Sequence, residues 1–296
     1  MNMDENKYAK VLAQYATAAD DAVVKSTVTR ILEKRQENDR PEVMKFLMGC
    51  VELTSLKTTD SEESIMALTE KVNRMDDEYP EVPHVASICV YPCFASVVSN
   101  TLQVDGVEIA CVSGSFPSSQ ALIEVKVAET ALACKDGATE IDMVMSVGRF
   151  LSEDYETVTD EISELKAACG EKRMKVILES GLLGNAANIK KAALLAMYSG
   201  ADFIKTSTGK ENSVATPEAA YVMCTAIKEY YEKTGIRIGF KPAGGLNSVE
   251  DALSYYTIVK EVLGEDWLTN ELFRLGTSRL ANLFLSRIIG KETVFF

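Results

Sequence analysis

The sequence predicts an α/β protein whose parallel strands close into a (β/α)8 TIM barrel, preceded by an N-terminal helical extension. Three observations support this prediction: short apolar runs rich in strand-forming residues alternate with longer helical patterns, the runs number eight, and they are apolar throughout. Strands without polar alternation are typical of a parallel sheet covered on both faces. An open doubly wound sheet is the alternative. The eightfold repeat and the lack of a G-x-G-x-x-G motif after the first strand favour the closed barrel.

Hydrophobic periodicity defines the expected elements. The strands cover Phe46–Leu53, Val85–Val90, Glu108–Ser113, Glu140–Met145, Lys175–Glu179, Phe203–Lys205, Arg237–Lys241 and Phe273–Gly276. Between the strands, apolar residues at i, i+3 and i+4 predict amphipathic helices, which include Ile65–Val72, Ala121–Lys135, Ile162–Cys169, Ile189–Tyr198, Ala219–Tyr231 and Val249–Leu263.

Local signals mark the ends of several helices. Thr216 and Ser248 each precede a first turn with acidic residues, as N-cap residues do. Gly137, Gly170 and Gly200 each follow a helical pattern, which is typical of glycines at helix C-termini.

Two parts of the chain are expected: residues 1–41 as the helical extension and residues 42–296 as the barrel catalytic domain. A single barrel of this fold commonly has about 250 residues, so the length does not require a second catalytic domain. The extension is too short to be one. We expect it either to cap the N-terminal mouth of the barrel or to mediate self-association into a homodimer or higher homo-oligomer.

Composition excludes several classes of function. The chain has 31 basic and 44 acidic residues and a formal charge of −13, which disfavours binding to nucleic acid or to anionic membranes. No apolar run approaches the roughly 20 residues of a membrane span, and the N-terminus is too polar for a signal peptide. The seven cysteines form no C-x-x-C pair. We therefore expect a cytoplasmic protein with reduced thiols that acts on small molecules.

The chain contains a single histidine, His84. Histidine triads with a spare residue, HExxH zinc sites and three-histidine metal sites are therefore excluded. A lone histidine beside a proline is most often structural. The chemistry is expected to depend on lysines, carboxylates or thiols.

Two lysines, Lys205 and Lys241, end consecutive expected strands, and a glycine-containing turn follows each. In a barrel these strands are neighbours, so the two ammonium groups should lie close together. An ordinary lysine has a pKa of about 10.4, and partial burial beside another cation can lower that pKa to about 7. A neutral amine can then attack a carbonyl to form an imine, which accepts electrons while a carbon–carbon bond breaks. This pattern favours a class I aldolase that needs no metal or cofactor.

A carboxylate, Asp142, interrupts an otherwise apolar strand. A buried aspartate is either paired or functional, and we expect this one to face the two lysines and to transfer protons. Lys175 and Glu179 are further candidates for inward-facing side chains, although a salt bridge at the end of the strand explains them equally well.

Glycine turns follow each of the last three expected strands, at Gly209-Lys210, Gly244-Gly245 and Gly276 to Arg279. Backbone amides in such turns, ahead of helix N-termini, commonly bind phosphate in barrels. A local positive site of this kind is what an acidic protein needs in order to bind an anionic substrate.

The same residues resemble the deoxyribose-phosphate aldolase family. Phe203–Lys210 is similar to the Schiff-base motif of the family and Gly239–Gly245 to its second-lysine motif, with further matches at Glu140–Asp142, Lys175–Glu179 and Ile88–Pro92. The similarity extends over residues 51–283. It implies a carbon–carbon lyase that reversibly cleaves 2-deoxy-D-ribose 5-phosphate to acetaldehyde and D-glyceraldehyde 3-phosphate in deoxyribonucleoside catabolism.

Matched position by position, the resemblance implies roles for individual residues. Lys205 would form the imine, Lys241 would lower the pKa of Lys205 and relay protons, and Asp142 would be the proton-transfer partner. The implied binding residues for phosphosugar and aldehyde are Thr208, Gly209, Lys210, Gly244, Gly245 and Ser278, with Thr54 and Cys89 along the substrate channel.

Two positions depart from the family pattern. Glu52 stands where the family commonly has aspartate, and Arg279 stands where the residue is usually small. Arg279 either strengthens phosphate binding or points into solvent. Two other functions share part of the pattern: a different lysine aldolase, such as a transaldolase or a ketose-bisphosphate aldolase, and a phosphosugar-binding regulator without catalysis.

Overall fold

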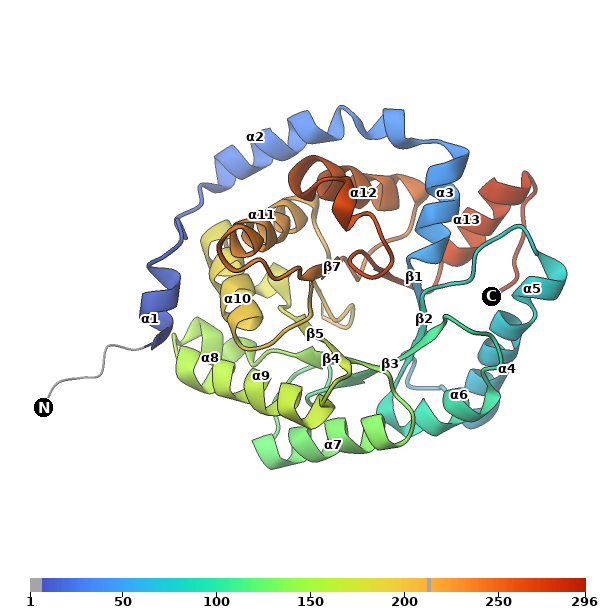
Figure 1. Cartoon of the computed structure of the whole chain (residues 1–296), viewed down its shortest axis with the longest axis horizontal. Helices are drawn as coiled ribbons and strands as arrows, with labels where there is room; N and C mark the ends of the chain where they lie inside the picture. The colour runs from blue at the N-terminus through green and yellow to red at the C-terminus, as the bar shows by residue number, and fades with distance from the viewer. Residues whose placement is uncertain (1–6, 212–213) are drawn as a thin grey trace, which may run out of the picture.

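Eight parallel strands form the centre of the computed structural model, which describes residues 7–211 and 214–296 (Figure 1). They are β1 (Val51–Thr54), β2 (Ser87–Val90), β3 (Glu108–Ser113), β4 (Glu140–Val144), β5 (Arg173–Ile177), β6 (Phe203–Lys205), β7 (Gly239–Lys241) and β8 (Leu275–Thr277). The strands pair in the order β7-β6-β5-β4-β3-β2-β1-β8. Parallel bridges from Phe240 to Phe273 and from Ala243 to Gly276 join the two ends of this order. The prediction of a barrel instead of an open sheet is confirmed.

Helices surround the strands. The longer ones are α2 (Asp21–Leu32), α3 (Pro41–Gly49), α4 (Glu62–Asn73), α7 (Ile123–Lys135), α9 (Tyr155–Cys169), α10 (Ala186–Tyr198), α11 (Pro217–Thr234), α12 (Val249–Leu263) and α13 (Leu280–Ile289). Short helices are α1 (Lys7–Leu12), α5 (Met75–Glu78), α6 (Ala95–Thr101) and α8 (Val147–Leu151), and 3-10 turns lie at η1 (Arg35–Asn38), η2 (Pro92–Phe94), η3 (Ser180–Leu182) and η4 (Glu265–Trp267). Among the described residues, no helix has both the length and the apolar character needed to span a membrane.

The helix ends agree with the local signals in the sequence. The Thr216 hydroxyl accepts a hydrogen bond from the Ala219 amide at 3.1 Å, and Ser248 forms a reciprocal capping box with Asp251. Gly170 is the C-cap residue of α9, with a positive φ of 61°. A glycine adopts this conformation without the steric cost that a side chain would add.

The first expected strand was placed too early, because residues 46–49 belong to helix α3. A short apolar run does not distinguish a strand from a buried helix by periodicity alone. Pro41 at the first helical turn and Glu42 beside it favour helix initiation. Val43, Met44, Leu47 and Met48 then form one buried face, and α3 packs against α13. Only the end of the run, from Val51, is strand.

The described part of the extension does not cap the mouth of the barrel, contrary to one of our two expectations. Helix α2 packs along α11 and α12, outside the ring of helices, as Figure 1 shows. Val24 and Val28 are its buried residues. At its start, the Asp21 carboxylate accepts a hydrogen bond from the Ala186 amide at 2.9 Å and so satisfies the free N-terminus of α10.

Candidate active site

Lys205 and Lys241 lie opposite each other in the register of β6 and β7, at the C-terminal ends of both strands. The same oxygen of Asp142, Oδ2, accepts a hydrogen bond from the Lys205 ammonium at 2.8 Å and from the Lys241 ammonium at 2.6 Å. All three side chains are buried. The three residues that the sequence predicted as catalytic are therefore in contact, with Asp142 on β4 facing Lys205 and Lys241 on the neighbouring strands β6 and β7.

A second layer of charge lies below these residues in the barrel. The Lys175 ammonium is 2.5 Å from Glu140, 3.0 Å from Asp142 and 3.2 Å from Glu52. Glu52 in turn accepts from Lys241. Lys175 is thus both an inward-facing residue and a member of salt bridges, so the two explanations for it in the sequence apply together.

The electrostatics of this group give Asp142 and Lys241 defined charges. Burial opposes ionisation of Asp142, but the ammonium groups of Lys175, Lys205 and Lys241 outweigh burial and hold the pKa of Asp142 well below its usual range. Burial also opposes the charged form of Lys241, but the carboxylates of Asp142 and Glu52 raise the pKa of Lys241. At neutral pH, Asp142 is a carboxylate and Lys241 an ammonium.

Gly276 makes room for Lys241. A Cβ atom at Gly276 would lie 2.9 Å from Cε of Lys241 and 2.7 Å from Cβ of Ala243. Any side chain at this position would push the lysine out of its place. The glycine in the Gly276 to Arg279 turn therefore has a role in the charged cluster as well as in the turn.

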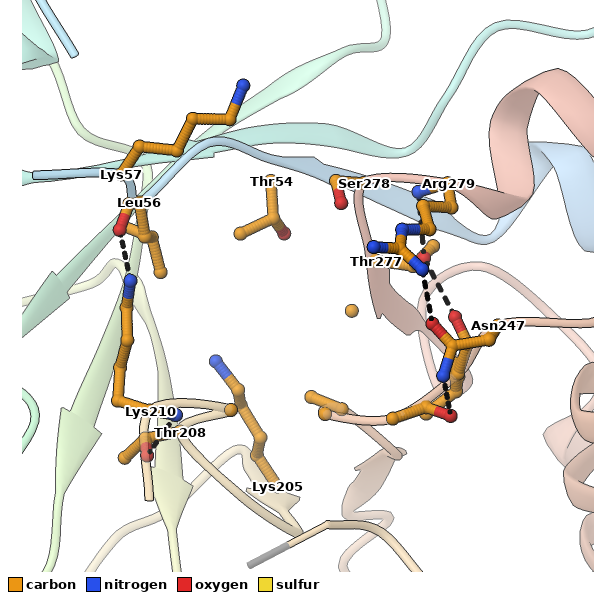
Figure 2. A pocket seen from close by; sticks show the side chains of 16 residues that line it. Thr54, Leu56, Lys57, Lys205, Thr208, Lys210, Asn247, Thr277, Ser278 and Arg279 are labelled. Carbon is orange, nitrogen blue, oxygen red and sulfur yellow. Dashed lines mark hydrogen bonds between the residues drawn. The ribbon is translucent and has the colours of Figure 1, made fainter. Parts of the chain in front are cut away.

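Lys205 extends from the buried cluster into a cavity of about 300 Å³ at the C-terminal mouth of the barrel (Figure 2). The cavity wall comes from the ends of β1, β6, β7 and β8 and consists of Thr54, Leu56, Lys57, Lys205, Thr208, Gly209, Lys210, Ala243, Gly244, Gly245, Leu246, Asn247, Gly276, Thr277, Ser278 and Arg279. Asp142 and Lys241 are not in this wall. Within the described chain, Lys205 is thus the ammonium that connects the buried cluster to the cavity.

The cavity is positively charged. Lys57, Lys205, Lys210 and Arg279 line it, and no carboxylate of residues 7–211 or 214–296 does so. In Figure 2, Lys210 stands on one side of Lys205, and Ser278 and Arg279 stand on the other. Lys210 donates to the Leu56 carbonyl, and Arg279 donates to Asn247 at 3.3 Å. Arg279 thus lines the cavity and is also exposed to solvent.

Glycine turns form part of the cavity wall together with these cations. Gly209, Gly244 and Gly245 have positive φ values of 73°, 83° and 77°. A Cβ atom at Gly244 would lie 3.2 Å from Cα of Gly209, so the two turns pack backbone against backbone. Only glycine permits both this conformation and this approach.

Glu179 holds the turn after β6. Its carboxylate accepts hydrogen bonds from the Thr208 hydroxyl at 2.5 Å and from the Thr208 amide at 3.2 Å. Glu179 itself has a left-handed backbone, with φ at 52°. A strand-end salt bridge was an alternative explanation for Glu179. Its observed hydrogen bonds to Thr208 instead position the segment that follows Lys205.

Cys89 is the one predicted binding residue that does not line the cavity. It is fully buried and packs with Leu56, Ala110 and Val112. Burial raises the pKa of the Cys89 thiol to about 11, so the thiol is neutral. The other residues predicted to bind substrate all line the cavity: Thr54, Thr208, Gly209, Lys210, Gly244, Gly245 and Ser278.

Sequence reasoning missed Arg274. Its guanidinium is buried and contacts Glu140 and Glu52. The signal that indicates Asp142, a charge within an apolar strand, is also present at Arg274 in the expected strand Phe273–Gly276.

Comparison with known proteins connects this geometry to a family. The sequence pattern of DeoC/LacD family aldolases matches residues 52–261. The deoxyribose-phosphate aldolase of Homo sapiens is 41% identical over 240 residues, which cover 78% of this chain and 76% of that protein. The Bos taurus enzyme of the same name is 40% identical over 241 residues, with the same coverage.

A solved structure agrees on the fold. The deoxyribose phosphate aldolase from Aeropyrum pernix, described as having a unique tetrameric structure, superimposes with a TM-score of 0.65 at 24% identity. The match covers 87% of this chain and 96% of that chain. At this identity, the likeness supports the barrel architecture alone.

Proposed function

This chain belongs to the DeoC/LacD aldolase family, and we propose that it is a class I aldolase that reversibly cleaves 2-deoxy-D-ribose 5-phosphate to acetaldehyde and D-glyceraldehyde 3-phosphate. The observation that carries this proposal is the position of Lys205, the lysine of the buried cluster that opens into a cationic cavity. The proposed setting is the breakdown of deoxyribonucleosides in the cytoplasm.

In the proposed reaction, the neutral amine of Lys205 attacks the aldehyde carbon of the open-chain sugar, and loss of water gives a protonated imine. The bond between C2 and C3 then breaks, its electrons move to the imine nitrogen, and the C3 hydroxyl loses its proton. D-glyceraldehyde 3-phosphate leaves, and an enamine stays on Lys205. Protonation at C2 and hydrolysis release acetaldehyde and regenerate the amine.

Asp142 is the proposed proton-transfer group. It is ionised at neutral pH, and its Oδ2 lies 2.8 Å from Lys205 Nζ. A carboxylate within hydrogen-bond reach can accept a proton from the attacking amine and return it to the departing water. Lys241, held as an ammonium on the same oxygen, is proposed to offset the charge of Asp142 so that Lys205 can be neutral.

The substrate phosphate is proposed to bind at the glycine turns of the cavity. Backbone amides of turns before a helix N-terminus, together with nearby cations, favour a phosphate dianion. Lys210 and Arg279 supply the cations, and α13 begins directly after the turn. The remaining proposed contacts are Thr208, Gly209, Gly244, Gly245 and Ser278 for the phosphate, and Thr54 for the sugar carbons.

Reductive trapping tests the proposed function. Incubation with acetaldehyde and borohydride should leave an ethyl group on Lys205, identified by mass mapping of the modified peptide. Lys205→Arg is the matched control, because it keeps a cation of similar length but cannot form the imine at neutral pH. An adduct on another residue, or on none, would contradict the proposed function. Dihydroxyacetone as an alternative donor distinguishes other lysine aldolases.

We also propose a homo-oligomer, in which α7 lies at the interface. Leu122, the N-cap residue of α7, is 74% exposed, and Val125 and Leu132 within α7 are each 56% exposed, so the helix presents apolar side chains to solvent. Light scattering should give a mass above that of one chain, and Val125→Glu should reduce it. A monomer at micromolar concentration would contradict this proposal.

The domain division at residue 41 is a proposal as well. Helix α2 contacts the barrel helices through a few apolar residues and the Asp21 hydrogen bond. Deletion of residues 1–40 should therefore leave the aldolase activity in place and lower the melting temperature.

A further inference from the structure

The buried ion cluster of the barrel contains more cations than carboxylates. Four cationic side chains and three carboxylates make up the cluster, and none of the residues is more than 3% exposed. The cations are Lys175, Lys205, Lys241 and Arg274, and the carboxylates are Glu52, Glu140 and Asp142. At the rim, Arg173 also reaches Glu140 but is balanced by the exposed Glu271. The Cys89 thiol nearby is neutral.

Such an excess is costly inside a protein. Charges away from water interact strongly, and a buried charge is tolerated only when an opposite charge compensates it. With every group ionised, the cluster carries one uncompensated positive charge. Loss of one proton from a lysine brings the cluster to balance.

The contacts identify which lysine gives up the proton. Lys175 contacts three carboxylates and Lys241 contacts two. Among the carboxylates of residues 7–211 and 214–296, Lys205 contacts Asp142 alone, and it faces the cavity at its other side. Arg274 cannot lose its proton at any physiological pH. Deprotonation of Lys205 therefore removes fewer ion pairs than deprotonation of Lys175 or Lys241 would.

Arg274 contributes the positive charge of the cluster that cannot be lost by deprotonation. It lies one residue before β8 and is not part of the cavity wall. Its Nη2 is 3.1 Å from Glu140 Oε1, and its Nη1 is 3.3 Å from Glu140 Oε2 and 3.5 Å from Glu52. Without Arg274, three lysines and three carboxylates would balance with Lys205 protonated.

We propose that Arg274 is a positioning residue for the aldolase reaction, because its fixed charge on Glu140 and Glu52 makes the neutral amine the balanced state of Lys205. This inference rests on the proposed function. Arg274 acts through the chain of contacts from Glu140 to Lys175, Asp142 and Lys205, and it touches neither substrate nor imine.

The test compares the pH dependence of acetaldehyde trapping on Lys205 in wild type and in variants of opposite charge. Arg274→Gln should move the half-maximal pH for trapping upward, with about tenfold less trapping near neutral pH. Glu140→Gln should move it downward, because removal of a carboxylate increases the positive excess. Arg274→Lys should restore the profile of the wild type. A merely structural defect would not give shifts of opposite sign.

Arg173→Gln is the matched control. Arg173 contacts the same Glu140, but its side chain is 24% exposed and paired with Glu271, so its loss should shift the profile far less. Unchanged profiles, or shifts of the same sign for Arg274→Gln and Glu140→Gln, would overturn the inference. If Arg274→Gln fails to fold by circular dichroism, the direction of the Glu140→Gln shift alone decides. Failure of the wild type to trap acetaldehyde would instead contradict the proposed function itself.

Discussion

Two buried lysines in this chain have different surroundings. Lys126, on the outer helix α7, is 1% exposed, and its ammonium donates to Ser119 at 2.9 Å, Ser146 at 3.0 Å and Glu161 at 3.0 Å. These acceptors use all three of its protons. Lys205, inside the barrel, is 3% exposed, and the described residues offer it one acceptor, Asp142.

The difference supports our proposal that Lys205, and not Lys126, is the reactive lysine. Lys126 has one carboxylate, two hydroxyls and no neighbouring cation among its hydrogen-bond partners in the described chain, so its ammonium is fully satisfied. Lys205 shares Asp142, its carboxylate partner among the described residues, with Lys175 and Lys241 and faces a cavity. Burial alone therefore does not distinguish the two residues. Incomplete pairing and access to a ligand do.

The largest expected effect comes from Lys205. Lys205→Met removes the nucleophile and should lower the retro-aldol rate by at least about 10⁴-fold. The protein should still fold, because the substitution removes a cation from a cluster that has one in excess. Initial rates and thermal melts of the purified variant measure the two quantities. Substantial residual activity would contradict the proposal that Lys205, unlike Lys126, is the nucleophile.

The matching substitution at the outer helix, Lys126→Met, should have the reverse outcome. It leaves Glu161 without its partner in a nearly buried site, which should cost about 3 kcal/mol of unfolding free energy. The turnover number should stay close to that of the wild type, since Lys126 is not in the cavity wall. Urea unfolding and steady-state kinetics provide the measurements. A folded Lys126→Met protein without activity would contradict the purely structural role that we assign to Lys126.

Acid should weaken the barrel cluster in a defined window. Burial opposes ionisation of Glu140, but Lys175 and Arg274 lower its pKa from 4.5 to about 2. A carboxylate with a depressed pKa stabilises the fold above the ordinary value and loses that contribution as pH falls through the depressed one. We expect a loss of about 3 kcal/mol between these limits. In Glu140→Gln, unfolding should depend less steeply on pH in this window, and an unchanged slope would contradict the assignment.

The smallest expected effect concerns the cavity wall. Lys210→Ala removes one cation from the proposed phosphate site and should raise the KM for 2-deoxyribose 5-phosphate about tenfold, as expected for loss of a charge-assisted hydrogen bond. Cleavage of unphosphorylated 2-deoxyribose should change little. Equal losses on both substrates would show that Lys210 acts on the reacting carbons and not on the phosphate.

The sequence indicated the proximity of the proposed catalytic residues more directly than it indicated the charged residues that surround them. Lys205, Lys241 and Asp142 stood out because each places a charge in an apolar strand, and the order of strands in a barrel brings them together. The helix at residues 46–49 was missed because a short apolar run suits a strand and a buried helix equally. The pairing of Arg274 with Glu140 and Glu52 joins strands far apart in the chain, so it appears only once the ring is closed.

Glu179 and Cys89 are two further residues whose contacts could not be predicted from the sequence. The hydrogen bonds of Glu179 to Thr208 depend on a left-handed backbone at Glu179 that its residue type does not signal. Cys89 lies beside the cavity in the fold, but whether a side chain lines a wall or lies behind it depends on the packing of its neighbours, here Leu56 and Val112.

The absence of a side chain at Gly276 limits how the enzyme can be redesigned. A single added methyl group there would strike Lys241 and Ala243, so β8 offers no freedom for enlarging or reshaping the pocket from below. A cavity for bulkier or uncharged aldehydes has to be remodelled at its outer rim, where Asn247, Ser278 and Arg279 have no contact with the ion cluster among the hydrogen bonds of the described chain. Libraries restricted to that rim should keep far more active members than libraries that include position 276.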